Sequence, residues 1–188
     1  MLAVVGTAVT TATGSSAVID LHHVNWKAAM LPGRVCGVSH RIQLHDGKAF
    51  VRSRRWPNLR RIEVAAGWNP VIYGDLDGDG LDEAALGASC SNGGGTADSA
   101  LAYAQVVYRA GTTSALAIGV LRPHWQPKHA LPTLLTVVLR RGRVIGREAF
   151  YGRRDGTCCP SGRAKTVWMY RHGTLRLASS LVTRRARQ

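Results

Sequence analysis

The fold class is decided by the segment Thr133-Leu-Leu-Thr-Val-Val-Leu-Arg-Arg-Gly-Arg-Val-Ile-Gly-Arg-Glu-Ala-Phe150. Apolar residues, many of them β-branched, occupy both halves of this segment, and Arg141-Gly142 separates the two halves. Short apolar runs joined by a tight glycine-containing turn are typical of a β-hairpin. We therefore predict two antiparallel strands over residues 133–139 and 143–150.

Working outward, the same pattern recurs at residues 41–51 around Asp46-Gly47 and at residues 165–178 around His172-Gly173. Short strands separated by glycine turns predict a mainly β, antiparallel, sandwich-like fold with long loops and little helix. Alanine-rich stretches at 84–88 and 100–104 could be helical on propensity alone. The length of 188 residues suits one domain, which we place at residues 18–180, followed by a basic tail at 181–188.

The chain is strongly basic, with 25 Lys and Arg against 11 Asp and Glu and a formal net charge of +14. Of the basic residues, 21 are arginine. Such a surface attracts polyanions, and we expect an anionic cell-wall or extracellular polymer as partner. An arginine excess with much alanine and glycine is also what a GC-rich coding sequence produces. Without a recognition helix, finger spacing or RNP-like motif, we expect no specific nucleic-acid binding.

The first residues combine an apolar run with a small polar stretch that ends at Ser15-Ser-Ala17. This order resembles the back half of a secretory signal, so we expect residues 1–17 to be a clipped signal segment. A secretory signal normally begins with basic residues, and no Lys or Arg precedes Lys27. A start codon assigned too late in the gene, or a buried first strand in place of a signal, would explain this. No run of 18 apolar residues occurs, which excludes a membrane-spanning helix.

The cysteines are Cys36, Cys90, Cys158 and Cys159, and an even number in a small basic chain favours two disulfides. A bond between neighbouring cysteines needs a strained ring, so we expect Cys158 and Cys159 to pair with Cys36 and Cys90, in either order. Four buried thiols in a cytosolic protein are the alternative. Zinc is disfavoured, because no cysteine or histidine pair has the spacing of a structural zinc site.

The densest cluster of acidic residues lies in Gly74-Asp-Leu-Asp-Gly-Asp-Gly-Leu-Asp-Glu-Ala84. Carboxylates at the first, third and fifth positions of a glycine-bent loop converge on one point, which suits a hard cation such as Ca²⁺. The predicted ligands are Asp75, Asp77 and Asp79, the Leu81 carbonyl and Glu83. The alternative is an acidic turn held by backbone hydrogen bonds without a metal. The twelfth position is Leu86, which excludes an EF-hand.

With a strand expected on each side, this loop resembles the calcium loops of the FG-GAP and VCBS class. That resemblance implies that Asp75, Asp77, Asp79 and Glu83 are side-chain ligands and that Leu81 binds through its carbonyl. Glu83 stands where that class usually has Asp.

Four pieces in the same order resemble a group of uncharacterised exported proteins of actinobacterial type. They are Asn25-Trp26 with Cys36 and the Asp46–Ala49 turn, the acidic loop up to Cys90, the turn at 141–144, and Phe150-Tyr-Gly152 with the Cys-Cys-Pro-Ser-Gly step at 158–162. This resemblance spans roughly residues 20–178 and implies an exported β protein, without implying an activity.

Together these features predict an extracellular or cell-surface domain, monomeric and stabilised by disulfides, with a structural Ca²⁺ and a non-enzymatic binding role. The alternative is a secreted hydrolase that acts on cell-wall or extracellular polymer. Only a weak pair of carboxylates, Glu148 and Asp155, could serve such a reaction, and no catalytic residue is predicted.

Overall fold

The computed structural model describes residues 18–67, 69–94, 99–127 and 131–187. Its helical turns are the short 3₁₀ segments η1 (Leu21–His23), η2 (Trp26–Ala28) and η3 (Gly33–Cys36). The strands are β1 (Met30–Leu31), β2 (Ile42–Gln43), β3 (Lys48–Val51), β4 (Ile62–Ala66), β5 (Ile72–Gly74), β6 (Glu83–Ser91), β7 (Ala100–Arg109), β8 (Leu116–Leu121), β9 (Leu134–Arg140), β10 (Arg143–Phe150), β11 (Gly162–Arg171) and β12 (Thr174–Arg184). The predicted mainly β class with little helix is confirmed.

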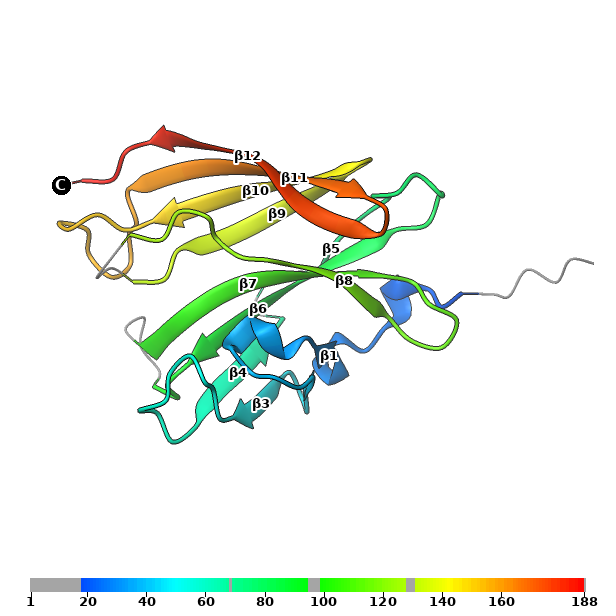
Figure 1. The fold of residues 1–188 in the computed structure, drawn as a ribbon, viewed down its shortest axis with the longest axis horizontal. Coiled ribbons are helices and arrows are strands. Elements are labelled where there is room, and N and C mark those ends of the chain that lie inside the picture. Colours follow the sequence, from blue (N-terminus) through cyan, green and yellow to red (C-terminus); the bar gives the residue numbers. More distant parts are fainter. Residues whose placement is uncertain (1–17, 68, 95–98, 128–130, 188) are drawn as a thin grey trace, which may run out of the picture.

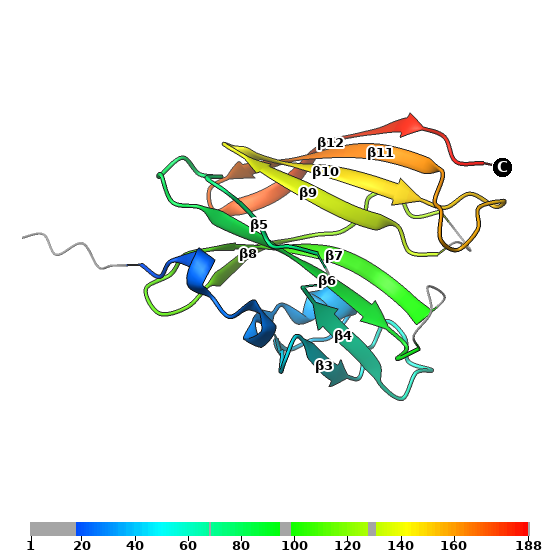
Figure 2. The ribbon, with the colours of Figure 1, turned by 180° about the vertical axis from the view of Figure 1, so that it is seen from behind.

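Two antiparallel sheets form the body of the molecule. The first has six strands in the order β3-β4-β6-β7-β8, with β5 paired to β6, and the second has four strands in the order β12-β11-β10-β9. They face each other as two layers (Figure 1), and a view from behind shows the same layers with η1 to η3 on the outer side of the six-stranded sheet (Figure 2). A small third sheet pairs β1 with β2.

The core between the two main sheets forms because each sheet turns apolar side chains inward. The six-stranded sheet contributes Ala85 and Val107, and the four-stranded sheet contributes Leu135, Val137 and Val144, all buried in one cluster. Along β9 and β10 buried and accessible residues largely alternate, as expected for strands with one face toward the core. This alternation is the pattern that predicted the hairpin at 133–150, and β9 and β10 confirm it.

A second core covers the outer face of the six-stranded sheet. Leu86 and Val106 pack there against Leu31 of β1 and Val35 of η3. The strand β6 therefore has a core on each face, and seven of its nine residues are buried, six of them in the continuous run from Glu83 to Ala88. Because both faces of β6 are buried, apolar residues, most of them small, occupy successive positions instead of alternating with polar residues. The helical alternatives at 84–88 and 100–104 are wrong, since these residues lie in β6 and β7.

The disulfide pairing differs from our expectation. Cys36 of η3 bonds to Cys90 of β6, across 54 residues, and Cys158 bonds to its neighbour Cys159 in the β10–β11 connection. The pairing of Cys158 and Cys159 with the two distant cysteines is therefore wrong. The physical reason is the fold, because the outer core brings η3 against β6, whereas the β10–β11 connection belongs to the other sheet.

The boundary of the basic tail also needs correction. Strand β12 extends to Arg184 and pairs with β11, so residues 181–184 belong to the four-stranded sheet. The expected signal segment at 1–17 lies outside the described residues.

Candidate functional site

The acidic loop connects β5 to β6 at the edge of the core between the sheets. Gly74 pairs with Glu83 at the base of the loop, so the chain leaves and re-enters the sheet at adjacent positions. Leu76 is fully buried and belongs to the inter-sheet core. Its carbonyl accepts a hydrogen bond of 2.7 Å from the main-chain N–H of Gly142, in the β9–β10 turn. The loop is thus attached to both sheets.

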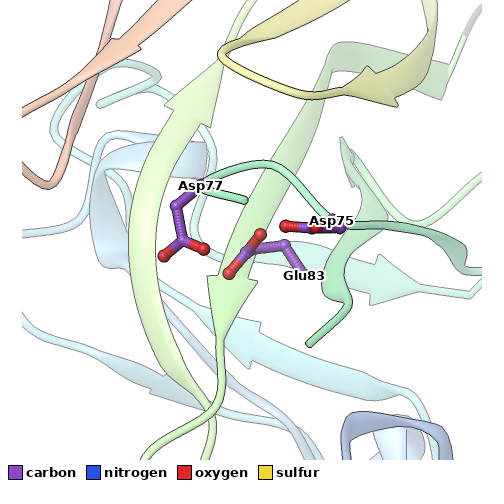
Figure 3. Close-up of side chains that lie close together, drawn as sticks. All are labelled: Asp75, Asp77 and Glu83. Carbon is purple, nitrogen blue, oxygen red and sulfur yellow. The ribbon is translucent and has the colours of Figure 1, made fainter. Parts of the chain in front are cut away.

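Three of the predicted ligands come together in this loop. One carboxylate oxygen from each of Asp75, Asp77 and Glu83 lies within 4.8 Å of the others, and Figure 3 shows the three side chains converging. Among the described carboxylates, Asp79 does not belong to this group, and the Leu81 carbonyl stays a prediction. Asp79 is exposed, and one of its oxygens accepts a 2.8 Å bond from the main-chain N–H of Leu81.

Main-chain donors hold the shape of the loop. Asp75 Oδ1 accepts from the Gly78 N–H at 2.6 Å, and Asp77 Oδ1 accepts from the Asp79 N–H at 3.2 Å. These are the hydrogen bonds expected of an acidic turn without a metal. Each bond uses only one oxygen of its carboxylate, so the second oxygen of Asp75 and of Asp77 remains available to a cation.

Glu83 is the buried member of the cluster, with 3 % of its surface exposed. Its Oε2 accepts a 2.7 Å hydrogen bond from the main-chain N–H of Leu76. Burial, with further contributions from the charges of Asp77 and Asp79, raises the pKa of Glu83 to about 7, although the hydrogen bond from Leu76 opposes the rise. A divalent cation would offset both the repulsion among these carboxylates and the cost of burying this one.

The β9–β10 turn lies over the loop. Gly78 has a φ of +86°, and a Cβ at this position would lie 2.5 Å from the Arg141 guanidinium. The positive φ favours glycine at residue 78, and the guanidinium of Arg141 occupies the space that a side chain there would take. The oxygen-only donor set of Asp75, Asp77 and Glu83 suits a hard cation.

Sequence reasoning missed two parts of this site, Leu76 and the β9–β10 turn. A leucine inside an acidic run is a weak signal for an anchor into the core. The contact with residues 141–142 has no local signal, because these residues are distant in sequence and meet the loop only when the two sheets pack.

A second feature is a concentration of arginine around the β3–β4 connection. This basic surface consists of exposed arginines at positions 52, 54, 55, 60 and 61. The Arg61 guanidinium lies 4.4 Å from the ring centroid of Phe50, whose surface is 52 % exposed, and Arg55 lies 5.0 Å from that of Trp56. In the described ranges four ion pairs occur, and none of them involves an arginine.

Two further arginines extend the basic surface. Arg122, after β8, donates a hydrogen bond to the carbonyl of Arg34 in η3. Burial, followed by the charges of Arg55 and Arg34, lowers the pKa of Arg122. Guanidinium groups from two other parts of the chain thus repel Arg122, and an anion bound beside Arg122 would relieve this repulsion.

The two carboxylates considered for glycoside hydrolysis are both engaged with the main chain. Glu148 is buried and accepts hydrogen bonds from His124 N–H and Trp125 N–H at 2.9 and 2.8 Å. Asp155 Oδ2 accepts from Gly152 N–H, Ser161 N–H and Ser161 Oγ–H at 2.7, 2.8 and 2.9 Å. These roles explain both residues as structural acceptors.

Within the part of the chain that the structure covers, no helix has the length and apolar character needed to cross a membrane. Comparisons with protein-family models, with curated proteins and with solved structures find no match for this chain.

Proposed function

We propose that this protein is an exported, non-enzymatic binding domain for an anionic extracellular polymer, stabilised by Ca²⁺ in its acidic loop. The observation that carries the binding role is the basic surface of the β3–β4 connection. Two of its exposed arginines lie over Phe50 and Trp56, and none of its arginines forms an ion pair with a carboxylate of the described residues.

Guanidinium groups recognise carboxylate and phosphate oxygens through their planar fork of donors. When an arginine already pairs with an acidic side chain, a ligand must compete with that pair. Here Arg55 and Arg61 lie over aromatic rings instead, which orients them while leaving their donors to the ligand. A line of such groups favours a repeating anion over a single small one.

The calcium proposal rests on the convergence of Asp75, Asp77 and buried Glu83. Asp79 and the Leu81 carbonyl, which sequence reasoning also assigned to the site, are proposed as ligands that join it when the exposed part of the loop closes on the ion. The role is structural, because the loop joins the two sheets through Leu76 and Gly142.

The calcium site is tested by thermal unfolding in about 1 mM Ca²⁺ and in EDTA. At 100-fold excess over the dissociation constant, Ca²⁺ would add about 2.7 kcal/mol, which raises the Tm by several degrees. Asp77→Ala and Glu83→Gln should abolish this difference, and Glu83→Gln retains an acceptor for the Leu76 N–H. Asp46→Asn is the matched control, since Asp46 is exposed in another turn. A Tm that does not respond to Ca²⁺ or EDTA rejects the site.

The binding role is tested with polygalacturonate, using dextran as the neutral polymer. The triple substitution Arg55→Gln, Arg60→Gln and Arg61→Gln should weaken binding about tenfold or more at moderate salt. The control triple Arg143→Gln, Arg171→Gln and Arg176→Gln removes the same charge from exposed positions of the four-stranded sheet and should have a small effect. Equal losses in both triples would mean that net charge alone binds the polymer, which contradicts a defined surface.

A further inference from the structure

A pocket of about 720 Å³ lies far along the chain from both features described above. Its walls come from the segment after β8, the end of β10, the β10–β11 connection and the segment that follows β12. Figure 1 shows the β10–β11 connection and the C-terminal segment at the same end of the four-stranded sheet. The volume is in the range of sites for small organic ligands.

One side of the pocket is aromatic. Phe150 and Tyr151 line it and keep only 7 % and 8 % of their surface exposed, so the protein itself fixes their rings. The ring of Trp125 lies nearly parallel to that of Phe150, at an interplanar angle of 24° and a centroid distance of 6.4 Å. Leu131 and Val182 extend this wall. Such a wall favours contact with an apolar part of a ligand over contact with a strongly hydrated group.

The other side of the pocket is basic. Arg153, Arg185 and Arg187 line it, and all three are exposed. The one carboxylate among the described lining residues is Asp155, whose Oδ2 already accepts three hydrogen bonds from Gly152 and Ser161. Three cationic groups against one engaged carboxylate leave the pocket with an excess of positive charge, which suits an anionic group on the ligand.

The walls are held together without a ligand. The main-chain N–H of Arg187 donates a 2.9 Å hydrogen bond to Ser161 Oγ, which in turn donates to Asp155. The main chains of Gly152 and Arg187 approach so closely that a Cβ at residue 152 would overlap the Arg187 carbonyl. A pocket that is preorganised in this way costs a ligand little ordering energy.

From these contacts we propose that the pocket binds a small amphipathic anion, an acyl or aryl carboxylate whose apolar body lies on Phe150 and Trp125. Its carboxylate faces Arg185 and Arg187. A sugar acid suits the walls less well, because the polar wall atoms are used internally or buried. Tyr151 OH donates to the Thr157 carbonyl at 2.8 Å, and the unpartnered Trp125 Nε1 and Asp155 Oδ1 are both buried.

The probe is decanoate, measured by isothermal titration calorimetry and by displacement of anilinonaphthalene sulfonate fluorescence. We expect saturable binding with one site per chain, and binding of decanol and of glucuronate at least about tenfold weaker. Arg185→Gln with Arg187→Gln should weaken decanoate binding by a similar factor. Arg171→Gln with Arg176→Gln is the matched control and should leave it unchanged. Val182→Trp, which fills the pocket without changing charge, should abolish it.

Several outcomes would overturn the proposal: no saturable binding of decanoate, decanol binding as tightly as decanoate, glucuronate binding more tightly than decanoate, or equal losses in the two arginine pairs. The inference does not depend on the polymer-binding role. The Arg55, Arg60 and Arg61 triple variant should bind decanoate as the unmodified protein does, and the Arg185 and Arg187 variant should retain polygalacturonate. Failure of one proposal is therefore distinguishable from failure of the other.

Discussion

At the scale of single residues, Asp155 organises the β10–β11 connection. One of its oxygens accepts hydrogen bonds from the main-chain N–H groups of Gly152 and Ser161. Ser161 Oγ in turn accepts a hydrogen bond from the main-chain N–H of Arg187. Hydrogen bonds from Gly152 and Ser161 lower the pKa of Asp155, and the charge of Arg187 lowers it further. The ionised carboxylate is thus the form that keeps this end of the fold together.

This arrangement predicts an acid-dependent loss of stability. Because the folded pKa of Asp155 lies below the unfolded value of about 3.9, its contribution is present above that value and is lost as pH falls through the folded pKa. Urea unfolding of the unmodified protein should therefore show a larger loss of stability between about pH 5 and about pH 2.5 than unfolding of Asp155→Asn.

The control for this comparison is Asp46→Asn, a substitution in an exposed turn away from this connection. It should retain the full difference between the two pH values. If Asp155→Asn lost as much stability on acidification as the unmodified protein, the assigned role of Asp155 would be wrong.

At the scale of elements, the two disulfides have different mechanical roles. Cys36 and Cys90 are fully buried and join η3 to β6 beneath the outer core. Cys158 and Cys159 are exposed neighbours within one connection. Only the first bond closes a long stretch of chain, and so only it restricts the unfolded state strongly.

We therefore expect unequal effects when each bond is removed. A closed segment of 54 residues corresponds to about 4 kcal/mol of lost unfolded-state entropy. Cys36→Ala with Cys90→Ala should lower the free energy of unfolding by about 2–5 kcal/mol in urea titrations under oxidising conditions. Cys158→Ser with Cys159→Ser should lower it by about 1 kcal/mol or less. Equal losses would contradict this division.

At the scale of the whole molecule, the six-stranded sheet supports two cores and separates two charged regions. One core faces the four-stranded sheet and the other lies under η3 and β1. The acidic loop lies where the two sheets meet, and the basic surface lies on the β3–β4 connection. A chain of net charge +14 thus confines five of its eleven acidic side chains, Asp75, Asp77, Asp79, Asp82 and Glu83, to residues 75–83, where a cation would compensate the cluster of Asp75, Asp77 and Glu83.

The sequence by itself determined the mainly β class, the hairpin of β9 and β10, and the closeness of three acidic side chains. Alternation along residues 133–150 predicts β9 and β10, and the spacing of Asp75, Asp77 and Glu83 is short enough for one loop to bring them together. Only the tertiary structure decided the disulfide pairing, the outer core over β6, the contact of Arg141 with the acidic loop and the pocket at Phe150. The reason is physical: local pattern reports the geometry of adjacent residues, whereas these features join residues that meet only when separate layers pack.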